Sequence, residues 1–102
     1  MLEMEKLLEC SVNKQASDLH LIPDLAPLLR IHGSLVFEKE KAKLTGEDTR
    51  NLVYSVMTAT QVELFEKNLV LEFALSVKNV GNFRVSVYNQ LHGVGAVFRV
   101  IP

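Results

Sequence analysis

Arg84 and Arg99 are the side chains of this sequence with the clearest potential for chemistry. A guanidinium is a planar, permanently charged fork that binds two oxygens of a phosphate or a carboxylate at once. Arg84 lies in segment 83–88, in which apolar and polar residues alternate. Arg99 lies in the last apolar segment, whose final residues are 98–102. Alternation is typical of a half-buried β-strand, so the face on which each arginine lies can be predicted.

Residues 90–93 can join these two strands in a hairpin, and the apolar residues then decide which positions are paired. The register that pairs Val85 with Phe98 also pairs the other apolar residues with one another. A register shifted by one residue would pair Val85 with Arg99 and bring a charge to the core face, which is costly. The favoured register places Arg84 directly opposite Arg99 on the other face of the sheet.

The preceding strand, 71–77, bears on whether these two cations are neutralised. Its apolar face matches when Leu75 pairs with Val85. That register leaves Glu72 about 13 Å from Arg84, at the rise of a strand. We therefore expect no acid of this strand to neutralise the pair, which would then suit a phosphate or the acid of a partner. An alternative stays open, in which both arginines are solvated or meet an acid from elsewhere in the fold.

The periodicity of the whole chain predicts the elements that position these residues. Apolar residues at three- and four-residue steps predict a helix over about residues 2–15. Thr45 followed by Asp48 is typical of a helix N-cap, and Thr60 followed by Glu63 predicts a capping box. The predicted strands cover residues 18–21, 28–32, 35–37, 71–77, 83–88 and the last segment before Pro102. This order predicts an α+β domain, with one antiparallel sheet of about six strands and helices on one face.

Other polar residues are weaker candidates. The charged segment 38–43 predicts a solvated loop, and Cys10 lies beside the apolar stripe of the first helix, where we expect a small buried hydrophobe. Asp18 and His20 share the polar face of the first strand, which favours a structural role. The three histidines form no close pair and no cysteine or cluster of acids completes a set, so we expect no metal site and no catalytic residue.

Composition limits the class of protein. The chain has 102 residues, enough for a single domain, and 11 basic against 12 acidic residues. A net charge of −1 argues against a broad nucleic-acid surface. No apolar run approaches the roughly 18 residues that span a bilayer, and the acidic start is unlike a secretory signal. We therefore expect a cytoplasmic protein.

Five segments resemble a known family, in order and with similar spacing. They are ASDLHL (16–21), PLLRIHGSL (27–35), LEFALSV (71–77), FRVSVYNQ (83–90) and GVGAVFRVIP (93–102). Together they resemble the amino-terminal domain of the PilT-type ATPases, which act in twitching motility, pilus assembly and type II secretion. The resemblance implies that residues 1–102 form a PAS-like domain, followed in a longer protein by a RecA-like ATPase domain.

The resemblance also implies roles for individual residues. Arg84 and Arg99 match arginines that sense the phosphates of a nucleotide held by the RecA-like domain. Asn82 stands where the family commonly has another arginine, so it is a possible auxiliary donor without charge. No G-x-x-x-x-G-K-[ST] motif occurs, so we expect no ATP hydrolysis and no tightly bound cofactor in this chain alone.

The same resemblance implies the setting of the longer protein. It would use ATP and Mg²⁺ and form a homohexamer in which this domain contacts RecA-like domains of its own and neighbouring subunits. Its partner would be an inner-membrane pilus platform protein, at the cytoplasmic face of the inner membrane. Two alternatives stay open: the domain of a pilus-assembly or type II secretion ATPase, and a free-standing PAS-like binding module. The short lead before ASDLHL favours the retraction type.

Overall fold

The computed structural model describes residues 2–38 and 41–102, and its elements follow the predicted order of helices and strands. They are α1 (Leu2–Asn13), β1 (Asp18–Leu21), β2 (Leu28–Ile31), β3 (Ser34–Phe37), α2 (Gly46–Tyr54), α3 (Ala59–Asn68), β4 (Val70–Val77), β5 (Gly81–Gln90) and β6 (Gly93–Ile101).

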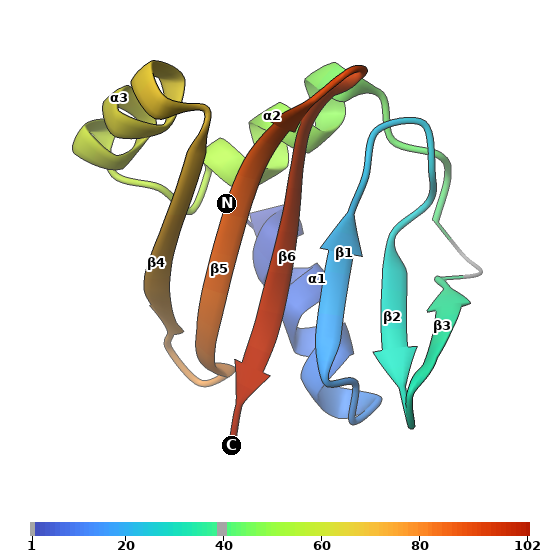
Figure 1. Cartoon of the computed structure of the whole chain (residues 1–102). Helices are drawn as coiled ribbons and strands as arrows, with labels where there is room; N and C mark the ends of the chain where they lie inside the picture. The colour runs from blue at the N-terminus through green and yellow to red at the C-terminus, as the bar shows by residue number, and fades with distance from the viewer. Residues whose placement is uncertain (1, 39–40) are drawn as a thin grey trace.

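In the described part of the chain, six strands form one antiparallel sheet in the order β3-β2-β1-β6-β5-β4. The three helices lie on one face of this sheet, behind the strands in Figure 1. The opposite face, turned toward the viewer, carries no helix formed by the described residues, and we call it the open face. The predicted α+β class is confirmed.

Threonine caps set the starts of α2 and α3. Thr45 accepts a hydrogen bond from the backbone of Asp48 at the start of α2, as predicted. The predicted cap at Thr60 is wrong, because α3 starts two residues earlier. Thr58 is the N-cap, and its side chain accepts from the backbone of Gln61 in a complete capping box. Both threonines fit the sequence pattern, because each is followed three residues later by Gln or Glu.

The hairpin of β5 and β6 has the predicted register. Phe83 faces Val100, Arg84 faces Arg99, and Val85 faces Phe98. Phe83, Val85 and Phe98 are each 0% exposed and belong to the core under the helices. Side chains alternate between the two faces of a strand, so both arginines lie on the open face.

The register predicted between β4 and β5 is wrong by two residues. Leu75 faces Phe83, where the prediction paired it with Val85. A shift of two residues keeps the apolar side chains of β4 on the covered face, so the pattern could not distinguish the two registers. Val77 faces Gly81, so the turn between β4 and β5 is two residues shorter than predicted.

Candidate functional site: a row of charges on the open face

Four charged residues on four neighbouring strands form one row across the open face. Arg30 of β2 faces Asp18 of β1, Asp18 faces Arg99 of β6, and Arg99 faces Arg84 of β5. The antiparallel registers alone bring them together, since Asp18 and Arg99 are 81 positions apart in the chain. The predicted juxtaposition of Arg84 and Arg99 is confirmed.

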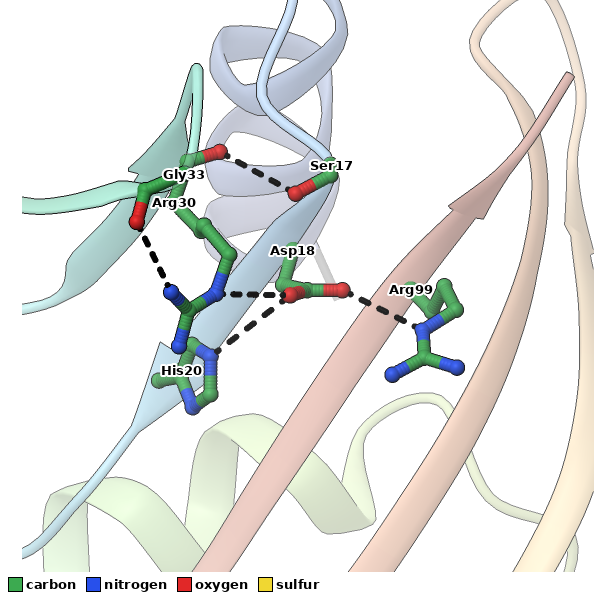
Figure 2. Close-up of polar contacts among 6 residues, drawn as sticks. All are labelled: Ser17, Asp18, His20, Arg30, Gly33 and Arg99. Atoms are coloured by element: carbon green, nitrogen blue, oxygen red, sulfur yellow. Dashed lines mark hydrogen bonds and ion pairs between the residues drawn. The ribbon is translucent and has the colours of Figure 1, made fainter.

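Asp18 is the centre of this row. Its side chain is 9% exposed, and the Nε of Arg99 donates to its Oδ1 at 3.3 Å. The Nε of Arg30 lies 3.3 Å from the other oxygen, Oδ2, so each oxygen holds one guanidinium (Figure 2). Arg30 is fixed further by a hydrogen bond from its Nη1 to the carbonyl oxygen of Gly33, at 3.1 Å.

Arg99 therefore follows the alternative that stayed open, because it meets an acid from elsewhere in the fold. The prediction considered only the strand on one side of the hairpin, whereas the acid comes from β1 on the other side of β6. The alternation in Asp18–Leu21 placed Asp18 on a polar face. Nothing local in the sequence showed that β1 would be the neighbour of β6.

Arg84 differs from Arg99 in this respect. Its side chain is exposed, and among residues 2–38 and 41–102 it has no hydrogen bond and no ion pair. Arg84 and Arg99 line a shallow depression of about 310 Å³, together with Glu72, Ser86 and Val97. Arg84 is thus a cation without a hydrogen-bond or ion-pair partner in the described part of the fold.

Glu72 lies closer to this depression than predicted. The corrected register places it opposite Ser86, two residues along the strand from the row of Arg84 and roughly 7 Å away at strand rise. The hydroxyl of Ser86 donates to Oε2 of Glu72 at 3.4 Å. The depression therefore has two guanidiniums and one carboxylate, and positive charge is in excess because Asp18 is shared with Arg30.

Asn82 lies on the same face as Arg84, one row further along, as predicted. Its Oδ1 accepts a hydrogen bond from the hydroxyl of Ser76 at 2.7 Å. The contact fixes the amide with its oxygen toward β4, which leaves the nitrogen as the donor that a ligand could use.

His20 lies next to Asp18 on the open face, also as predicted (Figure 2). Its Nε2 is buried, makes no hydrogen bond with the residues described, and lies 3.9 Å from Oδ2 of Asp18. Burial lowers the pKa of His20, against the opposing effect of Asp18. The ring therefore stays neutral at neutral pH and adds no charge to the row.

A second charged contact, which the sequence did not predict, joins α1 to the end of β3. Glu38 was expected in a solvated loop, but its side chain is 8% exposed. It accepts from the Sγ of Cys10 at 3.1 Å and from Nζ of Lys14 at 3.0 Å. Cys10 is half-buried and donates to a carboxylate, so it is more than the apolar filler that we expected. Residues 39–40 of the predicted loop lie outside the described residues.

Comparison with known proteins identifies the family. No protein-family model matches the chain. The type IV pilus retraction ATPase PilT of Pseudomonas aeruginosa is 38% identical over 99% of this chain, and the match covers 29% of PilT. The chain is homologous to the amino-terminal region of PilT. The type IV pilus ATPase PilU of the same organism is also 38% identical, over 98% of this chain and 26% of PilU.

A solved structure supports the relationship to PilT. The crystal structure of the pilus retraction motor PilT with bound ADP superposes with a TM-score of 0.87 at 37% identity, covering all of this chain and 29% of that one. The chain thus spans under a third of the length of these relatives. Among the residues that this structure describes, no helix is long and apolar enough to cross a membrane.

Proposed function

We propose that the chain is the nucleotide-sensing, amino-terminal domain of a type IV pilus retraction ATPase. Arg84 and Arg99 would contact the phosphates of a nucleotide that a RecA-like domain holds. One observation carries this proposal: Arg84 and Arg99 are paired across β5 and β6 on the open face, and Arg84 has no hydrogen-bond or ion-pair partner among the described residues.

During transfer, negative charge spreads over the oxygens of a nucleotide phosphate. A guanidinium that is already in place stabilises this charge without reorganising. Arg84 and Arg99 lie on a two-stranded ribbon whose other side is part of the core, so their backbones are rigid. Arrival of the phosphates would also relieve the repulsion between two adjacent cations, and this relief favours closure of this domain on the RecA-like domain.

The setting of the full-length protein belongs to the same proposal. The RecA-like domain would bind ATP and Mg²⁺ and hydrolyse the ATP, and the protein would form a homohexamer. In it, this domain would contact the RecA-like domains of its own and neighbouring subunits. The motor would act on a pilus platform protein at the cytoplasmic face of the inner membrane. The names of the relatives, which are pilus ATPases, support the ATP hydrolysis and the pilus motor in this setting.

The test is Arg84→Ala in the full-length protein, with ATP turnover as the readout. Removing one preorganised donor to a developing charge costs about 100-fold in kcat. The melting temperature should not change, because Arg84 makes no hydrogen bond or ion pair with the residues described. Arg50→Ala is the matched control, since Arg50 is an exposed arginine of α2. Turnover in the Arg84 variant equal to that of the Arg50 variant would reject the proposed function.

A pilus motor other than the retraction ATPase is the second candidate. The observation that favours it is the equal identity to PilU. The two candidates separate in cells: expression of the full-length protein should restore twitching to a strain without its retraction ATPase. Restoration only in a strain that lacks a different pilus ATPase would favour the second candidate.

A further inference from the structure

Asp18 is more deeply buried than the two arginines that it contacts, and this difference suggests a role beyond charge neutralisation. Its side chain is 9% exposed, whereas the side chain of Arg99 is 70% exposed and that of Arg30 is 38% exposed. A long exposed arginine has large rotamer entropy, so its end samples many positions unless something restrains it. Asp18 supplies such a restraint to Arg99.

The atoms in contact decide what the restraint leaves available. Asp18 binds Arg99 through Nε, on the side of the guanidinium nearest the strand. Nη1 and Nη2 of Arg99 have no partner among the described residues, and in Figure 2 no dashed line reaches them. These two nitrogens form the edge that binds two phosphate oxygens in a bidentate contact. The tether therefore orients Arg99 and leaves its binding edge open.

Arg30 prevents the carboxylate of Asp18 from turning. It holds Oδ2 at 3.3 Å while Arg99 holds Oδ1, and it is itself anchored to the carbonyl oxygen of Gly33. The result is a chain of contacts from the β2–β3 turn through Arg30 and Asp18 to Arg99. Every link is a side chain on the open face or a backbone atom at its border.

We propose that Asp18 is a positioning residue, which holds Arg99 by its Nε so that the Nη edge faces a phosphate in the depression beside Arg84. This role rests on the proposed function, because it needs a phosphate at Arg99. It differs from a structural ion pair, which would affect stability alone. It differs also from a latch, in which Asp18 would compete with phosphate for Arg99.

The experiment measures kcat and KM for ATP in the full-length protein with Asp18→Asn, which keeps the size of the side chain. Loss of orientation without loss of the cation should lower kcat about fivefold to tenfold and leave KM within about twofold. Asp24→Asn is the matched control, because Asp24 is an exposed carboxylate outside the row. A kcat equal to that of the control would overturn the positioning role, and a fall in KM with unchanged kcat would favour the latch.

A double variant shows whether Asp18 acts through Arg99. If it does, Asp18→Asn should have no further effect on kcat in a protein that already carries Arg99→Ala. Multiplied effects in the double variant would mean a structural role and would overturn the proposal. The proposed function fails separately, if Arg84→Ala turns over ATP as fast as the Arg50→Ala control.

Arg99→Lys tests the positioning role in a second way, which does not depend on the folding of Asp18→Asn. A lysine keeps the charge but has a single ammonium group, which cannot bind Asp18 and present a separate two-nitrogen edge. Residue 99 is exposed, so the fold should tolerate the change. We expect the same fivefold to tenfold loss of kcat as in Asp18→Asn. Wild-type turnover in Arg99→Lys would show that charge alone suffices and would overturn the positioning role.

Discussion

The two faces of the β5–β6 ribbon are built from alternate residues of the same two strands, yet they differ in burial and in charge. On the covered face, Phe83, Val85 and Phe98 are fully buried. On the open face, Arg84 and Arg99 are exposed and charged. Burial of apolar area is the main source of stability, and exposed charges add little to it. Substitutions on the covered face should therefore change stability, and substitutions on the open face should change activity.

Phe98→Ala should have the largest effect on stability and tests the covered face. Removing a fully buried phenylalanine leaves a cavity and costs about 3–5 kcal/mol of unfolding free energy. Urea unfolding of the 102-residue chain, followed by circular dichroism, measures this loss. Val97→Ala is the control, because Val97 is the preceding residue of β6 and lines the depression on the open face. Equal losses in the two variants would contradict the contrast between the faces.

Glu38 is an exception to this contrast, because it is a buried charge at the border between α1 and the sheet. Hydrogen bonds from Cys10 and Lys14 lower the pKa of Glu38 below its usual value of 4.5. A carboxyl group with a lowered pKa in the folded state contributes stability above 4.5, and that stability is lost as the pH falls through the folded-state pKa. Glu38→Gln should therefore cost about 1–3 kcal/mol at pH 7.

The pH dependence separates this effect from simple loss of packing. The difference in unfolding free energy between wild type and Glu38→Gln should shrink as the pH falls below 4.5, because protonation removes the charge from the wild type as well. Urea titrations at pH 7 and at successively lower pH measure it. A difference that stays constant over this range would show that Glu38 contributes through its shape and not through its charge.

The success and failure of the sequence-based predictions follow the range of the interactions. The β5–β6 register could be predicted, because a shift of one residue would have buried Arg99. The β4–β5 register could not, because a shift of two residues buries the same apolar side chains. The contact of Asp18 with Arg99 depends on the order of strands in the sheet, which no local pattern encodes. The burial of Glu38 depends on where α1 packs.

Only one part of the candidate site could thus be predicted from the sequence. The facing arginines follow from a hairpin, which is a local structure. The carboxylate that restrains one of them comes from the opposite end of the chain. The family resemblance marked both arginines as equivalent phosphate sensors, whereas the structure makes them unequal: Arg99 is tethered, and Arg84 has no partner among the described residues.

The smallest expected effect is the difference in stability between the Arg99 and Arg84 variants, because Arg99 is tethered and Arg84 is not. Arg99→Ala removes one of the two partners of a buried carboxylate, but Arg99 is 70% exposed and Arg30 remains, so the loss should be about 0.5–1 kcal/mol. Arg84→Ala should change the unfolding free energy by less than about 0.5 kcal/mol, since no hydrogen bond or ion pair with the described residues is lost. Differential scanning calorimetry of both variants at low and high salt checks the difference. Added salt screens an exposed ion pair, so the gap should narrow as salt increases. A larger loss for Arg84→Ala would mean that Arg84 has a structural role, and the assignment of free and tethered cations would then be reversed.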